Sequence, residues 1–476
     1  MNRVYVKDVT SYVDQKVLLK GWAKNLRLLG KIGFVELRDR TGFVQCVLLK
    51  ENSQEYFNLL KETTIESVIE VEGIVKLRSK EQINKENEFG EYEVEVQKYS
   101  LLSKAGPLPI PVDSDGYDIS EESRLKYRYL DLRRERLQKN LILKSKFSNL
   151  VREYLLKNDF VEIETPILSA PTMEGARDFL VPSRLQSGKF YALPQSPQQY
   201  KQLLMVSGFE RYFQLARCFR DEDLRADRGF EFTQIDLEMS FVNQEDIMNF
   251  VENMLVNIIS NLGYKFQSIP FKRFTYQEAM SQFGADKFDL RTESEKQENI
   301  LSFAWVYKFP FFKKVDTNDK AEVKDGKSGW TFTHNPFSAP EDQYIQDHLE
   351  AKNIENIITQ QYDLVCNGFE VGGGSIRAHD PEVLKATYRI MGYTEEEIES
   401  NIGHMLEAFK VGVPPHGGIA LGLDRIVSIL CSEKSLKEVI AFPMTYKGAV
   451  SVMNAPISIE DDSLSELGIK KFKNNQ

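Results

Sequence analysis

The segment of residues 219–238, FRDEDLRADRGFEFTQIDLE, constrains the fold and the chemistry of this chain more than any other stretch. It predicts two strands, Arg217–Glu222 and Phe232–Glu238, joined by a charged loop. Because side chains alternate along a strand, Arg220 and Glu222 share one face of the first. A rigid hairpin with a cation, an aromatic ring and carboxylates suits a triphosphate, a purine and an amino group bound together. A solvated surface hairpin is the competing interpretation. The polar face of the second strand comprises Phe232, Gln234, Asp236 and Glu238.

The first 104 residues predict an all-β module. Alternating apolar residues, separated by turns, indicate five strands, with one helix-like segment near residues 55–62. Five strands in this length fit an OB-type barrel. The predicted strands are Lys16–Ala23, Ile32–Arg38, Phe43–Leu49, Val68–Leu77 and Tyr92–Leu101.

One face of the predicted barrel combines an aromatic ring with polar side chains. Val35 and Leu37 point to one side of their strand, which leaves Phe34 among polar residues on the other. A ring in such a position stacks unpaired bases in modules of this type. The alternative, that Phe34 caps the barrel core, stays open at this point.

The composition is that of an ordinary globular protein. The chain has 476 residues, of which 42% are hydrophobic and 28% charged, and this length allows two or three domains. It shows neither a signal peptide nor an apolar run of bilayer length, so we expect a cytoplasmic protein without a membrane partner. The net charge of −10 disfavours a general nucleic-acid coat. Residues 124–139 nevertheless hold seven Lys or Arg and only two acidic residues, and form a candidate RNA surface.

A proline-rich segment divides the chain. Residues 106–111, GPLPIP, separate the β module from a longer mixed region, which opens with a helix that carries apolar residues at helical spacing over 143–155. The predicted organisation is therefore a β-barrel domain over residues 1–104, a linker or hinge over 105–140, and a large α+β domain over 141–476.

Further motifs supply polar side chains for the same site. The segment PQSPQQYK places Gln198 and Lys201 on one face of a predicted helix. Asp363 and Glu370 bracket a strand that leads into Gly372-Gly373-Gly374, where missing side chains allow a ligand to approach the backbone.

In this order, the motifs resemble those of class II aminoacyl-tRNA synthetases, and specifically the bacterial-type aspartyl-tRNA synthetases. FVEIETPILS resembles motif 1, the hairpin resembles motif 2, and GIALGLDR resembles motif 3. EGARDFLVPS, ALPQSPQQYKQLLM, FEVGGGSIR and IAFPMT are similar to the aspartyl subgroup. The resemblance implies an OB-type anticodon-binding barrel followed by a catalytic domain, an α+β fold built on an antiparallel sheet flanked by helices.

The activity implied by the resemblance is aspartate–tRNA ligation. L-Aspartate and ATP form aspartyl-adenylate, and the aspartyl group passes to the 3′-terminal adenosine of tRNA(Asp). The resemblance also implies Mg²⁺ on the triphosphate and a homodimer formed through motif 1. Two alternatives stay open: an enzyme that also charges tRNA(Asn), and a tRNA-binding paralogue that has lost activity.

The resemblance also implies roles for individual residues. Arg220 and Arg425 resemble the catalytic arginines, and Asp363 and Glu370 resemble the Mg²⁺ carboxylates. The residues similar to ATP contacts are Arg220, Asp221, Glu222, Phe232, Glu370, Gly422, Leu423, Asp424 and Arg425. Those similar to aspartate contacts are Glu174, Ser196, Gln198, Lys201, Arg220, Asp236, His334 and Arg377. Those similar to anticodon contacts are Arg27, Phe34, Gln45 and Glu93.

The chain departs from the family pattern at several places, among them the closing loop, His334-Asn335-Pro336, where two histidines are common, and Met173, which replaces a usual proline. Bacterial-type members carry a large insertion domain between motifs 2 and 3, and this domain is absent here near residues 291–301. Inside motif 2, the usual Gln-Pro is replaced by Gly229-Phe230, which removes a glutamine contact to ATP or leaves it to a backbone group.

Overall fold

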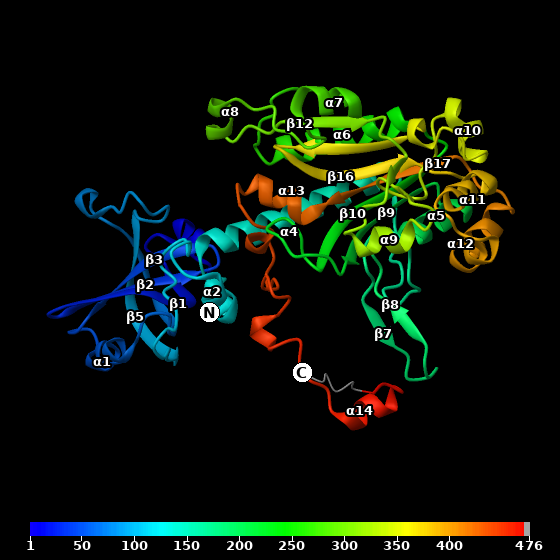
Figure 1. Cartoon of the computed structure of the whole chain (residues 1–476). Helices are drawn as coiled ribbons and strands as arrows, with labels where there is room; N and C mark the ends of the chain where they lie inside the picture. Colours follow the sequence, from blue (N-terminus) through cyan, green and yellow to red (C-terminus); the bar gives the residue numbers. More distant parts are fainter. Residues whose placement is uncertain (471–476) are drawn as a thin grey trace. The chain divides into compact units, whose positions relative to one another are not determined.

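The computed structural model describes residues 1–470 (Figure 1). The chain separates into two compact units, Met1–Pro111 and Val112–Gln476. The division falls at the end of the proline-rich segment of residues 106–111. Proline favours such a boundary because its fixed φ and missing N–H disfavour both helix and sheet.

The first unit is the closed five-stranded barrel that the sequence predicts, with strand order β1-β2-β3-β5-β4. Neighbouring strands are antiparallel, except that β3 and β5 are parallel. The elements of this unit are η1 (Val6–Tyr12), β1 (Lys16–Leu29), β2 (Ile32–Asp39), β3 (Gly42–Leu49), α1 (Gln54–Glu62), β4 (Val68–Leu77), η2 (Lys80–Gln82) and β5 (Tyr92–Ser103).

Alternation of side chains separates the barrel core from the outer face. Val35 and Leu37 of β2 are fully buried, as the pattern predicts. Phe34 is only half-buried, and its neighbours across the sheet are Arg27 in β1 and Val47 in β3. Among the described residues, the barrel core forms without Phe34. Phe34 therefore does not cap the core and is available on the outer face.

The second unit contains one large sheet, two small sheets and surrounding helices. Its strands are β6 (Val161–Glu162), β7 (Leu180–Pro182), β8 (Phe190–Ala192), β9 (Arg211–Phe219), β10 (Glu231–Ser240), β11 (Lys272–Thr275), β12 (Phe303–Tyr307), β13 (Phe312–Lys314), β14 (Trp330–Phe332), β15 (Gln361–Cys366), β16 (Phe369–Ile376) and β17 (His416–Gly422). Its α-helices are α2 (Glu121–Lys126), α3 (Arg128–Asp131), α4 (Glu135–Lys157), α5 (Gln198–Val206), α6 (Gln244–Asn261), α7 (Tyr276–Phe283), α8 (Glu293–Gln297), α9 (Lys320–Asp325), α10 (Ile345–Leu349), α11 (Pro381–Ile390), α12 (Glu395–Phe409), α13 (Leu423–Leu430) and α14 (Asp461–Glu466). Its short 3-10 helices are η3 (Asp342–Tyr344), η4 (Ile354–Asn356), η5 (Leu436–Val439) and η6 (Ser451–Met453).

The large sheet has eight strands in the order β11-β12-β15-β16-β17-β10-β9-β6. All neighbouring pairs from β12 to β9 are antiparallel, whereas the edge strands β11 and β6 pair in parallel. The prediction of an antiparallel sheet flanked by helices is therefore confirmed for the central strands (Figure 1).

The two faces of the large sheet differ in polarity. Ile235 and Leu237 of β10 point into the main hydrophobic core, together with Phe147 and Val151 of α4. Helices α6 and α13 contribute side chains to the same core. Because side chains alternate, the intervening residues of β10, including Asp236, face the other side. That polar face is where a ligand can be held against the sheet.

The first strand of the predicted hairpin ends earlier than the sequence suggests. β9 ends at Phe219, so Arg220 and Glu222 follow the strand instead of alternating within it. The chain leaves the sheet here because the N–H of Asp221 donates to the carbonyl oxygen of Arg177 at 3.0 Å. This interaction with the loop after motif 1 could not be read from local periodicity.

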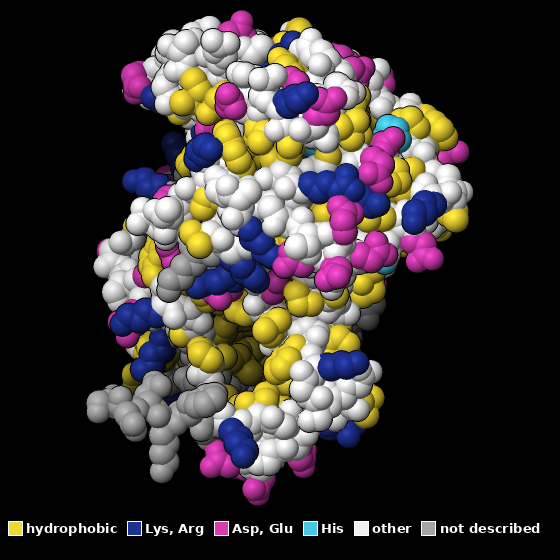
Figure 2. Space-filling view, turned by 45° about the vertical axis from the view of Figure 1, so that its right-hand side comes forward, with side chains coloured by type: hydrophobic (Ala, Val, Ile, Leu, Met, Phe, Trp, Pro, Cys, Tyr) yellow, Lys and Arg dark blue, Asp and Glu magenta, His cyan; other side chains and the backbone are white. Residues whose placement is uncertain are grey.

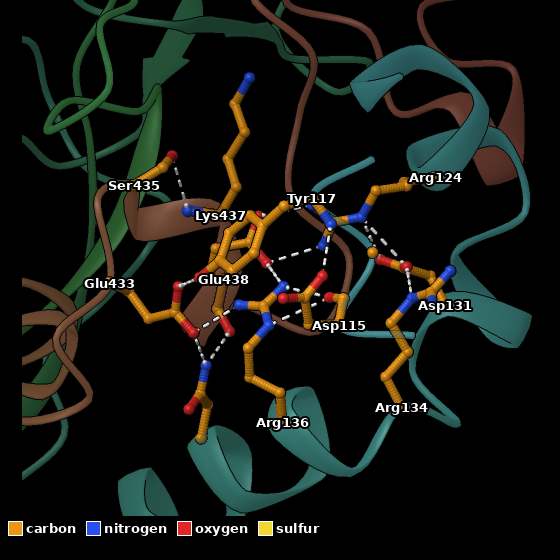
Figure 3. A network of polar contacts seen from close by, with 12 residues as sticks. Asp115, Tyr117, Arg124, Asp131, Arg134, Arg136, Glu433, Ser435, Lys437 and Glu438 are labelled. Atoms are coloured by element: carbon orange, nitrogen blue, oxygen red, sulfur yellow. Dashed lines mark hydrogen bonds and ion pairs between the residues drawn. The ribbon is translucent and has the colours of Figure 1, made fainter. Parts of the chain in front are cut away.

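The basic segment of residues 124–139 takes part in a buried ion-pair network (Figure 3). Arg124, Arg128 and Arg134 are at most 6% exposed, and all three pair with Asp131. Arg124 also forms two hydrogen bonds, of 3.1 and 2.7 Å, with the carboxylate of Glu438. The prediction of an RNA surface is therefore wrong for these three arginines, because Asp131 pairs with all of them and Glu438, about 300 positions away, also pairs with Arg124.

The surface visible in Figure 2 mixes charges of both signs. Lys and Arg side chains lie among Asp and Glu side chains there, without one continuous basic field. In the described part of the chain, no helix has the length and apolar character needed to cross a membrane.

Candidate active site

A cavity of about 1110 Å³ lies on the polar face of the large sheet. Its wall combines β10, β16, the start of α5, the start of α13 and the loop after β9. Asp363 and Leu423 are each only 2% exposed and are not part of the wall that the described residues form. The predicted substrate residues in the wall are Glu174, Ser196, Gln198, Lys201, Arg220, Asp221, Glu222, Phe232, Asp236, His334, Glu370, Arg377, Gly422, Asp424 and Arg425.

Four buried charges form a compensated cluster at the wall. Lys201 Nζ lies 2.6 Å from Asp236 Oδ1 and 3.3 Å from Glu238 Oε2. Arg377 donates from Nε and Nη2 to the two oxygens of Glu238, at 2.8 and 3.0 Å. Each of these side chains is at most 2% exposed. Two cations and two anions balance one another, as burial of charge requires.

The sequence predicts that Glu238 lies on the polar face of its strand, as observed. It assigns no function to this residue. Burial raises the pKa of Glu238, but the charges of Arg377 and Lys201 outweigh burial and hold that pKa below its usual value. A glycine in β17 could have indicated that Glu238 has a buried carboxylate. A Cβ on Gly418, its partner across the sheet, would lie 2.1 Å from Glu238 Oε2. The glycine therefore makes room for the carboxylate.

Two carboxylate oxygens of the wall are buried without a donor among the described residues. They are Oε1 of Glu174 and Oδ2 of Asp236. The other oxygen of Glu174 accepts a 2.5 Å hydrogen bond from Ser196, and that of Asp236 binds Lys201. Burial raises the pKa of both carboxyl groups, opposed by Ser196 at Glu174 and by Lys201 at Asp236. A buried acceptor without a partner is costly, so these atoms suit a ligand that brings N–H donors.

Two arginines of the wall have a donor without an acceptor in the described structure. These donors are Nε of Arg220 and Nε of Arg425. The Arg220 guanidinium lies 5.1 Å from the ring centre of Phe232. Arg425 is anchored by its Nη groups, which donate to the carbonyl oxygens of Glu370 and Asp227. Partly unsatisfied guanidinium groups are well suited to phosphate oxygens.

The two predicted metal carboxylates lie on adjacent strands rather than on one strand. Asp363 is in β15 and Glu370 is in β16, and the two strands form a hairpin with a register shift between residues 364 and 365. Asp363 accepts a 2.7 Å hydrogen bond from Gln361 and lies 3.5 Å from Nδ1 of His334. Glu370 pairs with Lys287 at 2.7 Å.

These two carboxyl groups have opposite pKa shifts. Burial raises the pKa of Asp363, and the neighbouring charge of Glu370 adds to that effect although His334 opposes it. Burial also disfavours ionised Glu370, but the ammonium of Lys287 outweighs burial and lowers its pKa. The two shifts differ because Lys287 pairs directly with Glu370 at 2.7 Å, whereas Asp363 has His334 beside it at 3.5 Å.

Two residues of motif 3 have structural positions that differ from the implied ATP contacts. Leu423 is part of the main hydrophobic core, so its side chain faces away from the cavity. Asp424 uses one carboxylate oxygen for Lys144 of α4 and the other for the N–H of Thr233, at 3.0 Å. Its carboxylate thus joins α13 to β10 and α4.

The three glycines of β16 serve strand packing as well as access to the cavity. All three line the cavity, as expected for a close approach of ligand to backbone. A Cβ on Gly374, however, would lie 2.1 Å from the carbonyl oxygen of Gly418, and one on Gly373 would lie 2.9 Å from Asp363 Oδ1. Side chains here would therefore collide with β17 and with a predicted metal carboxylate.

Gly229 and Phe230, the unusual pair in motif 2, lie in different surroundings. Gly229 lines the cavity. Phe230 packs edge-on against Phe179, with ring centres 5.4 Å apart, and leaves no room for a Cβ on Gly448. Phe230 is thus part of the contact between this loop and the C-terminal segment.

The predicted anticodon residues share the outer face of the barrel. Arg27 lies opposite Phe34, and Gln45 lies opposite Glu93. Gln45 donates a 3.1 Å hydrogen bond to Glu93. The structure therefore gathers an exposed cation, a ring and an amide on one surface of the first unit.

Comparison with known families identifies the second unit. The family model described as tRNA synthetases class II (D, K and N) matches residues 120–446. The chain belongs to the class II tRNA synthetases. In this synthetase, a second model, described as an OB-fold nucleic acid binding domain, matches residues 17–102 of the barrel.

Relatives of this synthetase match it over nearly its whole length. The aspartate–tRNA(Asp/Asn) ligase of Chlorobium chlorochromatii is 38% identical, and the alignment covers 97% of this chain and 94% of the relative. The aspartate–tRNA ligase of Staphylococcus saprophyticus is 36% identical, with 97% of each chain covered.

Solved structures of class II synthetases share this fold. An asparaginyl-tRNA synthetase from Pyrococcus horikoshii, complexed with asparaginyl-adenylate, has a TM-score of 0.71 at 25% identity, with 94% of this chain and 98% of that one covered. An aspartyl-tRNA synthetase from Entamoeba histolytica has a TM-score of 0.73 at 21% identity, with 93% and 91% covered.

Proposed function

We propose that this synthetase is an aspartate–tRNA ligase. The observation that carries the proposal is the set of unsatisfied groups in one cavity: carboxylate acceptors at Glu174 and Asp236, and guanidinium donors at Arg220 and Arg425. These acceptors suit the ammonium of an amino acid, and these donors suit the phosphates of ATP. The names of the relatives from Chlorobium chlorochromatii and Staphylococcus saprophyticus support aspartate as the amino acid.

The buried cluster accounts for recognition of the aspartate side chain. Arg377 has five N–H donors and directs three hydrogen bonds to Glu238 and Ser375, so donors remain for a substrate carboxylate. Lys201 supplies a second cation beside it. Gln198, Ser196 and His334 also line the cavity.

Activation of aspartate requires no protein nucleophile. The α-carboxylate of aspartate attacks the α-phosphorus of ATP, the bond to the bridging oxygen breaks, and pyrophosphate leaves with its electron pair. Arg220 neutralises negative charge that develops on the α-phosphate, and Phe232 stacks on the adenine while Glu222 and Asp221 border it. Arg425 supports the triphosphate from α13. A ribose hydroxyl at the 3′ end of tRNA then takes the aspartyl group.

The residues of this site fit Mg²⁺ bound together with ATP. Glu370 lines the cavity and Asp363 lies directly behind its wall, and Mg²⁺ in nucleotide sites commonly takes one or two carboxylates plus phosphate oxygens. The described residues contain no cluster of three or more potential metal ligands, so the triphosphate would add ligands to those of Asp363 and Glu370. When bound, the ion neutralises charge on the leaving pyrophosphate.

We propose further that the barrel binds the anticodon through the face that holds Arg27, Phe34, Gln45 and Glu93. A half-buried ring on the outer face, beside a cation and an amide, is the arrangement that stacks and reads unpaired bases. Glu93 also lies 3.7 Å from Arg78, which extends the polar surface.

Phe34→Ala should weaken charging without affecting adenylate formation. Loss of a stacked base is expected to raise the KM for tRNA roughly 10- to 100-fold. Aspartate-dependent exchange between pyrophosphate and ATP, which needs no anticodon, should keep its wild-type rate. Equal losses in both reactions would instead indicate a damaged fold.

The function is tested most directly by offering two tRNAs separately. We expect aspartate-dependent pyrophosphate exchange and charging of tRNA(Asp) with aspartate. Charging of tRNA(Asn) with aspartate would establish the non-discriminating activity, which the (Asp/Asn) name of the Chlorobium chlorochromatii relative favours. Absence of exchange at every Mg²⁺ concentration would contradict the ligase and favour a tRNA-binding paralogue.

We propose a homodimer formed through motif 1 and a cytoplasmic location, as suits a translation enzyme. Apolar side chains of motif 1 are exposed in the single chain, with Ile167 at 48% and Leu168 at 53%. Covering them against a second copy would bury apolar area that one chain leaves in water. Light scattering should then give twice the 54.9 kDa of one chain, and a monomeric mass would contradict the dimer.

We also propose the domain division 1–104, 105–140 and 141–476, with no insertion domain near residues 291–301. The alignment with the Chlorobium chlorochromatii relative spans 583 positions although this chain has 476 residues, which supports a missing segment. The short helix α8 fills this region, with a capping box formed by Thr292 and Glu295. Residues 124–134 take part in the buried ion-pair network of the second unit, so limited proteolysis should cut first in the proline-rich part of this segment, near residues 105–111. A first cut elsewhere would argue against the hinge.

A further inference from the structure

We propose that Lys287 is a further catalytic residue, which holds Glu370 before substrates bind and moves to the leaving pyrophosphate when ATP and a divalent cation enter. This inference rests on the proposed function. Lys287 lines the cavity, and its Nζ lies 2.7 Å from Glu370 Oε2. Lys287 thus supplies the positive charge that balances the carboxylate of Glu370.

The backbone on either side of Lys287 is fixed, so its side chain is directed by the fold. Phe288, the next residue, is 7% exposed and its ring stacks on Phe283, with centres 4.1 Å apart. Asp289 binds the guanidinium of Arg291 through both oxygens. Anchors of this kind leave the flexible four-carbon stem of Lys287 as the mobile part.

The charges at this end of the cavity explain why the ammonium has to move. A divalent cation shared by the triphosphate and Glu370 would repel an ammonium held at hydrogen-bond distance from the same carboxylate. The Lys287 side chain is 40% exposed and lines the cavity, so its ammonium has room to turn toward a ligand there. The nearest new anion is then the outer part of the triphosphate, which a compact ammonium with three donors binds well.

The chemical role follows from the proposed reaction. As the bond between the α-phosphorus and the bridging oxygen breaks, its electron pair remains on pyrophosphate. Lys287 donates hydrogen bonds to that leaving group and neutralises part of its new charge, and no proton is transferred. Arg220 and Arg425 line the same cavity and act on the same triphosphate.

Lys287→Met, which keeps the length of the stem and removes the charge, should produce two effects of opposite sign. In the full chain without nucleotide, Mn²⁺ binding measured by electron paramagnetic resonance should tighten several-fold, because Glu370 loses its competing cation. In pyrophosphate exchange, the KM for ATP should rise at least about tenfold, because a charged hydrogen bond to phosphate is lost. Lys287→Arg should restore much of the ATP affinity.

The matched control is Lys296→Met, which removes an exposed lysine that pairs with Glu293 on α8. It should leave both measurements at wild-type values. Weaker or unchanged Mn²⁺ binding in Lys287→Met, or an unchanged KM for ATP, would overturn the inference. If the wild-type chain showed no pyrophosphate exchange, the proposed function would be overturned instead. The Mn²⁺ measurement would then test only whether Lys287 competes with a metal ion for Glu370.

Discussion

Arg220→Ala is expected to lower aspartate-dependent pyrophosphate exchange by about 10²–10³-fold, because it removes a donor aimed at charge that develops in the transition state. Arg220 Nε has no acceptor among the described residues, and no ion pair ties its guanidinium to the rest of the described chain. Its guanidinium makes a cation–π contact with Phe232, and its charge acts on the carboxyl group of Glu174. The free energy of unfolding should therefore fall by no more than about 1 kcal/mol. A large kinetic loss with little loss of stability is the expected result.

Arg217→Ala is the matched control for this variant. Arg217 lies in β9, three residues before Arg220, and pairs at 2.9 Å with Glu231 on the partly exposed surface, away from the wall of the large cavity. Exchange should stay close to the wild-type rate. If both variants lost exchange equally, or if Arg220→Ala kept most of it, Arg220 could not be the group that neutralises the α-phosphate.

Local periodicity predicts much of this fold because the decisive patterns repeat at short range. The barrel strands, the separation of Val35 and Leu37 from Phe34, and the polar face of β10 all follow from alternation alone. The end of β9 does not, because a hydrogen bond from Asp221 to a distant loop decides it.

Charge partners are the part of the site that the sequence leaves undetermined. Seven cations in residues 124–139 suggest a nucleic-acid surface only while their partners are unknown. The structure places Asp131 and Glu438 beside Arg124 (Figure 3). Arg124, Arg128 and Arg134 are all buried. Count and spacing of like charges thus do not distinguish a solvated surface from a compensated cluster.

Glu238 illustrates the same limit within the active site. Its strand position is predictable, but its two partners come from α5 and from the end of β16, about 40 and 140 residues away. The family resemblance assigns Lys201 and Arg377 to the substrate and leaves their counter-ion unnamed. The role of Glu238 as counter-ion becomes clear only from the three-dimensional positions of Lys201, Asp236, Glu238 and Arg377.

Glu238→Gln should lower the free energy of unfolding of the second unit by about 3–5 kcal/mol, because it leaves buried Arg377 and Lys201 without a full counter-charge. The folded pKa of Glu238 is lowered, so its contribution to stability is complete above the usual glutamate pKa and is lost as pH falls through the folded value. Urea unfolding followed through the buried Trp305 should therefore show a large difference at pH 7 and a smaller one below about pH 4.

L-Aspartate should reverse part of this loss, and asparagine should reverse less. The substrate carboxylate brings a negative charge to the two uncompensated cations, so aspartate should stabilise Glu238→Gln more than it stabilises the wild-type chain. Glu231→Gln, which alters an exposed carboxylate on the same strand, should change stability by no more than about 0.5 kcal/mol and respond to aspartate like wild type. Equal stabilisation of Glu238→Gln by both amino acids would show that Arg377 and Lys201 do not face the substrate side chain. The preference for aspartate would then have to originate elsewhere in the cavity.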